Sequence, residues 1–111
     1  MTVSQVEIEQ NILRLSELCE RATHEVRKRG EAKASARTEF AVEFAKARLR
    51  SERSTVGERE DEATVACAAL LNEKEFTEAL FESAKEAGRN YRAQLDALRS
   101  INANLRPLVT A

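Results

Sequence analysis

The sequence has 111 residues, of which 33% are charged and only 5% are aromatic, and its formal net charge is −1. This length indicates one domain, and a composition rich in Ala, Glu, Leu and Arg is typical of long helices or coiled coils. The near-zero charge excludes a global field that would attract nucleic acid or an anionic membrane. The first residues, MTVSQVEIEQ, lack the apolar core of a signal peptide, so we expect a soluble intracellular protein.

The first predicted helix spans about residues 5–52. Ser4-x-x-Glu7 has the form of a capping box at its start. Apolar residues then recur at helical spacing, with Ile8, Ile12, Leu15, Phe40 and Phe44 on one face. Gly30 follows a basic turn, which is a helix-stop signal, but strong helix formers resume at once. We therefore expect a helix that is continuous or kinked at this glycine.

The stretch RSERSTVGERED, residues 50–61, separates this helix from the next. A phosphate-binding loop needs several glycines and a Lys-Ser/Thr pair after a strand, and these features are missing here. Thr55-x-x-Glu58 instead has the form of a second capping box. Acidic residues crowd the turns after it, where they favour a helix N-terminus. We expect a simple turn over about residues 53–56.

The second predicted helix spans about residues 57–104. Its apolar stripe has largely heptad-like spacing and includes Leu70, Leu80, Tyr91, Leu95 and Leu98. Gly88 is a second candidate for a kink. We expect Pro107 to stop the helix, which leaves residues 105–111 as a short tail.

The predicted fold is therefore all-α, a long antiparallel helical hairpin with coiled-coil character that forms a single domain over residues 1–111. Ten residues form its expected core or oligomer seam: Ile8, Ile12, Leu15, Phe40, Phe44, Leu70, Leu80, Tyr91, Leu95 and Leu98. One hairpin buries a small core, and apolar residues off the stripe, such as Leu13 and Leu49, need cover. A homo-oligomeric bundle provides it, and folding at Gly30 and Gly88 into a four-helix bundle is the alternative.

Charge is divided between the two predicted helices. Residues 27–53 hold nine basic and four acidic residues, and residues 54–90 hold four basic and nine acidic residues. In one interpretation these charges flank the seam and fix its register. In the other, the basic segment binds nucleic acid. The candidate residues are Arg27, Lys28, Arg29, Lys33, Arg37, Arg48, Arg50 and Arg53.

Residues that carry catalysis or bind metals are sparse. His24 and Glu20 lie one turn apart, but a structural zinc site needs about four ligands. Cys19 and Cys67 have no neighbouring histidine, and a hairpin keeps them too far apart for a disulfide. We expect no enzyme activity, no metal and no cofactor.

Residues 39–106 combine four features: Ala45-Lys46-Ala47-Arg48-Leu49 on a helix, a charged turn, a helix rich in Ala and Glu, and an amphipathic end, YRAQLDALRSINANLR. In this combination they resemble small helical proteins of bacteriophage recombination modules. The resemblance implies a homo-oligomer in the cytoplasm of a bacterial host that binds single-stranded DNA or recombination proteins. The competing hypothesis is a protein-binding module, such as a phage inhibitor of a host defence complex or a structural assembly adaptor.

Overall fold

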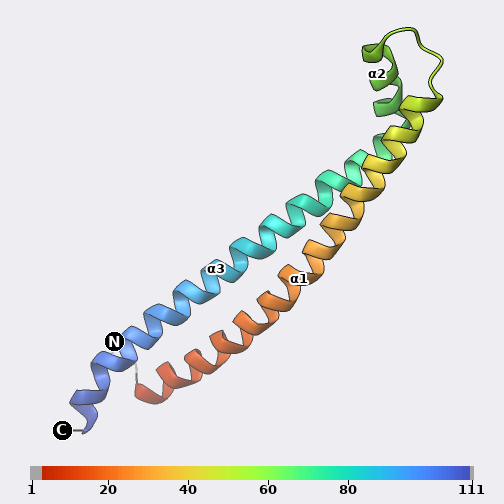
Figure 1. The fold of residues 1–111 in the computed structure, drawn as a ribbon. Helices are drawn as coiled ribbons and strands as arrows, with labels where there is room; N and C mark the ends of the chain where they lie inside the picture. The colour runs from red at the N-terminus through yellow and green to blue at the C-terminus, as the bar shows by residue number, and fades with distance from the viewer. Residues whose placement is uncertain (1–3, 111) are drawn as a thin grey trace. The chain divides into compact units, whose positions relative to one another are not determined.

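The computed structural model describes residues 4–110, with side chains through residue 105. The described chain forms three helices and no strand: α1 (Gln5–Arg50), α2 (Val56–Ala66) and α3 (Ala68–Thr110) (Figure 1). It divides into two compact units, unit 1 with Met1–Val26 and Ser83–Ala111, and unit 2 with Arg27–Glu82. Each unit pairs a stretch of α1 with an antiparallel stretch of α3. The predicted all-α helical hairpin is therefore confirmed, while its assembly into an oligomer stays a prediction.

Local signals start α1 as the sequence predicts. The Glu7 backbone N–H donates to Ser4 Oγ at 3.1 Å, and the Ser4 N–H donates to Glu7 Oε2 at 3.3 Å. This reciprocal pair satisfies two backbone donors that a helix start leaves open. α1 continues through Gly30 and α3 through Gly88, so neither glycine ends a helix.

The core of unit 1 is a narrow seam between the two helices. Ile8 and Leu15 from α1 are each 2% exposed, and Leu95 from α3 is also buried. Ile12, Tyr91 and Leu98 are half-buried beside them. Every seam residue predicted in this unit is thus removed from water at least in part.

The core of unit 2 combines small buried residues with half-buried aromatic rings. Ala36, Ala63, Cys67 and Thr77 are buried. The predicted seam residues here are all half-buried: Phe40, Phe44, Leu70 and Leu80.

Two lysines cover aromatic rings across the helix pair of unit 2. Lys33 Nζ of α1 lies 4.8 Å from the centre of the Phe81 ring of α3. In the second contact the lysine is on α3 and the ring is on α1. Lys74 Nζ lies 5.4 Å from the centre of the Phe40 ring. Such cation–π contacts contribute about 0.5–1 kcal/mol each at exposed sites. They hold the two helices in one register.

The second predicted helix is interrupted at Cys67, which the sequence analysis did not predict. Cys67 has φ −103° and ψ 20°, and its backbone N–H donates to the carbonyls of Ala63 and Val65. No glycine or proline marks this position. Ala63 and Cys67 are both buried, so we attribute the break to packing of α2 into unit 2.

The prediction that Pro107 stops the second helix was wrong, because α3 continues to Thr110. Proline removes its own amide donor and crowds the carbonyl four residues earlier, which can bend a helix without ending it, because the amides of residues 108–110 can still donate one turn back. The expected tail over residues 105–111 is therefore helical through residue 110, and residue 111 lies outside the described chain.

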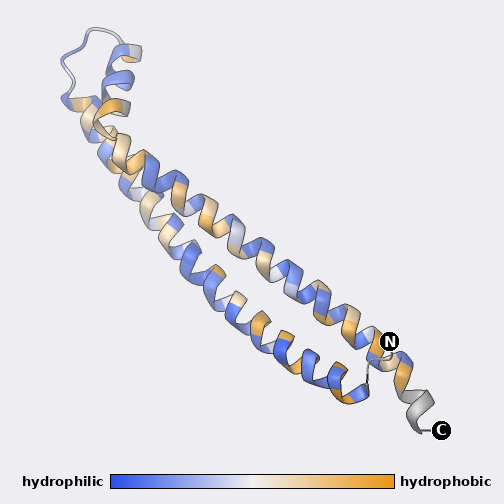
Figure 2. Ribbon diagram, turned by 180° about the vertical axis from the view of Figure 1, so that it is seen from behind, coloured by the Kyte–Doolittle hydropathy of each residue, from blue (hydrophilic) through white to orange (hydrophobic). Residues whose placement is uncertain are grey.

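Several large apolar side chains remain exposed, because a single seam cannot cover them. Figure 2 shows hydrophobic and hydrophilic residues interspersed along both long helices. In unit 2 the exposed ones are Val42, Leu49, Val56, Val65 and Phe76. Among the described residues, no helix has an apolar run long enough to cross a bilayer.

Candidate nucleic-acid interface

The eight basic residues proposed as a nucleic-acid surface all lie in unit 2. Seven of them belong to α1, and Arg53 lies in the linker between α1 and α2. Three of the eight side chains interact with other residues of the same chain. Lys33 covers Phe81, Arg53 pairs with Glu62, and the half-buried Arg29 also has an interaction partner. Each of these three cations therefore already has a partner within the chain.

The other five basic residues are exposed. None of them forms an ion pair with any residue of the described chain: Arg27, Lys28, Arg37, Arg48 and Arg50. Each keeps a full positive charge in contact with water. These five side chains are the part of the predicted surface that remains available to a ligand.

The helical repeat arranges four of these residues in two rows. At about 100° per residue, Arg37 and Arg48 lie about 20° apart, and Lys28 and Arg50 lie about 40° apart on nearly the opposite side of the helix. At 1.5 Å per residue the first pair is separated by about 16 Å and the second by about 33 Å. Such rows suit an extended chain of phosphates better than a compact anion.

The aromatic residues contribute little to this surface. Phe40 and Phe44 contact each other with ring centres 5.5 Å apart, and Lys74 covers Phe40. Tyr91 is half-buried and lies in unit 1, where it lines a hollow of 310 Å³. Phe76 of α3 is the one aromatic side chain that is mostly exposed. A ligand here would be held by charge, with little base stacking.

The charged turn between α1 and α2 satisfies its own polar groups. Ser51 Oγ donates to Glu62 Oε2 at 2.9 Å, and Arg53 Nε donates to the same oxygen at 3.2 Å. Arg59 Nε donates to the backbone carbonyl of Arg53 at 2.7 Å. Thr55 caps α2, because its Oγ1 accepts the Glu58 N–H at 3.1 Å. Residues 51–55 form the linker between α1 and α2, close to the turn expected over residues 53–56.

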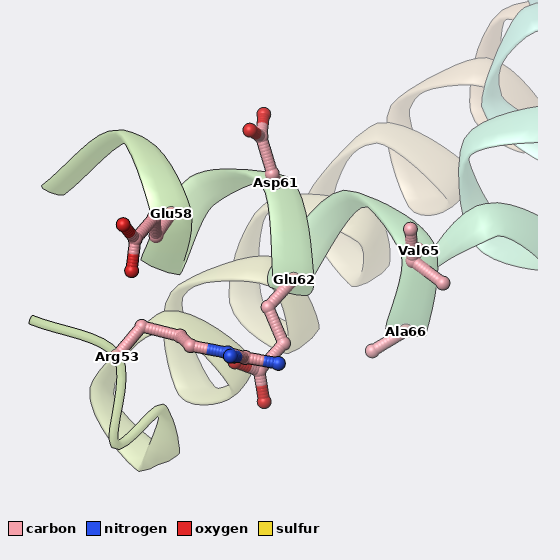
Figure 3. Close-up of a pocket in the computed structure, with 6 residues that line it drawn as sticks. All are labelled: Arg53, Glu58, Asp61, Glu62, Val65 and Ala66. Atoms are coloured by element: carbon pink, nitrogen blue, oxygen red, sulfur yellow. The ribbon is translucent and has the colours of Figure 1, made fainter. Parts of the chain in front are cut away.

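A hollow of 530 Å³ lies beside this turn, and the sequence analysis missed it. Its lining residues are Arg53, Glu58, Asp61, Glu62, Val65 and Ala66 (Figure 3). Figure 3 shows the Arg53 guanidinium beside the Glu62 carboxylate. The Glu58 and Asp61 side chains point away from this pair. No sequence signal indicated this site, because it forms only when the linker and α2 meet.

Residues suited to catalysis or metal binding remain scattered. His24 is exposed, and Cys19 and Cys67 are free thiols. Through the part of the chain that the structure describes, no three His, Cys, Asp or Glu residues are grouped to hold a metal ion. Comparison with protein-family models, with curated proteins and with solved structures finds no match to this chain.

Proposed function

We propose that this chain is a non-enzymatic, phage-like accessory protein of DNA recombination that binds single-stranded DNA as a homo-oligomer in the bacterial cytoplasm. The observation that carries the proposal is the group of five exposed basic residues on α1 without an ion pair. The resemblance of residues 39–106 to small helical proteins of phage recombination modules supports the same class.

The proposed contact is made to phosphates. Arginine and lysine contacts to the backbone carry no sequence information, so binding should tolerate any base sequence. Each phosphate contact to a single strand adds about 0.7 to the slope of log affinity against log salt. Five contacts would give a slope of about −3.5, which is the largest value that these residues allow, and three contacts would give a slope of about −2.1.

The test is titration of a fluorescent single-stranded oligonucleotide at low and moderate salt. The variant Arg27→Glu/Arg37→Glu reverses two of the five charges. Its matched control, Arg14→Glu/Arg99→Glu, makes the same change in net charge at exposed positions in unit 1. We expect the first variant to bind about tenfold more weakly or worse and to lose about 1.4 from the salt slope. We expect the control to bind much more like the wild type. Absence of binding at low salt, or equal losses in both variants, refutes the proposal.

A second candidate function is a protein-binding module, which includes a phage inhibitor of a host defence complex and an assembly adaptor. The observation that favours it is the group of exposed apolar side chains near α2. Leu49 and Val56 line a hollow of 220 Å³, and Val65 lines the larger one. Exposed apolar patches on a small protein commonly mark protein contacts. A purified partner that binds at high salt, with no affinity for DNA at low salt, would favour this function over the first.

A further inference from the structure

Leu49 is the most exposed large apolar side chain of the described chain, at 82%. It lies one residue from the C-terminal end of α1, between Arg48 and Arg50. Residues next to each other on a helix point about 100° apart, so one arginine borders Leu49 on either side. Leu49 therefore forms an apolar knob flanked by two unpaired cations.

The 530 Å³ hollow beside α2 has the opposite character. Val65, which is 78% exposed, and Ala66 provide its apolar surface. Arg53 already pairs with Glu62, but Glu58 and Asp61 form no ion pair with any other residue that the structure describes. The hollow therefore offers exposed apolar surface on the same helix as two unpaired carboxylates, which point outward from α2.

We propose that a second copy of this chain occupies this hollow, with its Leu49 on Val65 and its Arg48 and Arg50 against Glu58 and Asp61. One apolar side chain meets one apolar floor, and two cations meet two anions. This match of apolar surface and charge identifies the occupant. The inference rests on the homo-oligomer of the proposed function and names the surface through which it assembles.

Knob and hollow both belong to unit 2, so the contact can be reciprocal. In a two-fold dimer each copy would insert its Leu49 and receive the partner's on Val65. Such a contact closes on itself and does not extend into fibres. It also engages Arg48 and Arg50, which leaves Arg27, Lys28 and Arg37 as the cations for DNA in the dimer.

The test measures the mass of the full chain by light scattering or sedimentation, in buffer without DNA. Variant X, Arg48→Glu/Arg50→Glu, makes the border of the knob acidic. Variant Y, Glu58→Lys/Asp61→Lys, makes the border of the hollow basic. All four side chains are exposed, so circular dichroism should show both variants folded. Leu49→Ser tests the apolar part of the contact, with Leu13→Ser in unit 1 as its control.

We expect the wild type to dimerise and the dissociation constant of X alone and of Y alone to rise about tenfold or more, because like charges then face each other. An equal mixture of X and Y should restore the dimer, because each mixed contact again joins opposite charges. Leu49→Ser should weaken the dimer and Leu13→Ser should not. A monomeric wild type, dimers of X or Y alone as tight as the wild type, or a mixture that stays monomeric would overturn the inference.

The two proposals fail separately. A monomeric chain that binds single-stranded DNA would overturn this contact and the homo-oligomer, and would leave only the DNA binding of the proposed function in place. A dimer that responds to the variants as described but has no affinity for DNA would support this contact and refute DNA binding.

Discussion

Replacing Gly88 with alanine is a direct test of how closely α1 and α3 pack in unit 1. Gly88 is a buried residue in the interior of α3. A Cβ at this position would lie 3.5 Å from Ala22 Cβ and 3.5 Å from Arg92 Nη2, which is ordinary van der Waals contact. Alanine should therefore fit without moving its neighbours.

The expected gain follows from the cost of glycine in a helix. Alanine is favoured over glycine in a helix interior by about 1 kcal/mol. For a chain of this size, that change raises the unfolding temperature by about 4 °C. The new methyl group also buries apolar surface against Ala22, which adds to the gain.

At Gly30 the same substitution would place the new methyl group too close to a neighbouring side chain. A Cβ there would lie 3.2 Å from Cε2 of the Phe81 ring, so the ring must shift. The ring also supports Lys33, so its movement disturbs the cation–π contact. We expect Gly30→Ala to gain clearly less than Gly88→Ala, or to lose stability.

Urea unfolding followed by the helical circular dichroism signal measures both variants. Gly57→Ala is the control for propensity at an open site, because nothing lies within 4 Å of its added Cβ. A lower urea concentration at the unfolding midpoint of Gly88→Ala would mean that the added methyl group does not fit between the helices, which would refute the packing described for Gly88. An equal gain for Gly30→Ala would refute the contact with Phe81.

Three further features, a helix cap, a buried seam residue and a cation–π contact, can be tested by the same unfolding measurement. Thr55→Ala removes the side-chain cap of α2 and should cost about 1 kcal/mol, whereas Thr55→Ser should cost much less; equal losses would argue against the cap. Leu15→Ala empties a site that is 2% exposed and should cost about 2–5 kcal/mol. Leu13→Ala, at a side chain 67% exposed, should change stability by less than about 0.5 kcal/mol, and the opposite ranking would contradict the seam. Lys74→Met keeps the apolar stem but removes the charge above Phe40, so it should cost about 0.5–1 kcal/mol, and no loss would mean that the charge contributes nothing there.

Much of the candidate site was predictable as a set of residues but not as a surface. The sequence places a dense group of basic residues on one helix. It does not say that Arg53 pairs with Glu62 or that Lys33 lies on Phe81. Those partners belong to other segments of the chain, so only the structure shows which cations have a partner and which do not.

The sequence by itself determined the features that depend on near neighbours along the chain. Ser4 with Glu7 and Thr55 with Glu58 mark helix starts because a cap involves residues three apart. The spacing of Ile8, Leu15 and Leu95 places them on buried faces because the helical period is local too.

Only the tertiary structure decided the features that depend on distant residues. The break at Cys67 has no breaker residue, and it occurs where Ala63 and Cys67 pack into unit 2. Thr77 is buried by packing in unit 2, and only its hydroxyl is satisfied locally, by the carbonyls of Glu73 and Lys74 at 3.0 Å. The hollow beside Val65 exists only where the linker meets α2. Packing energy, summed over contacts from separate segments, sets these features, and no local pattern encodes it.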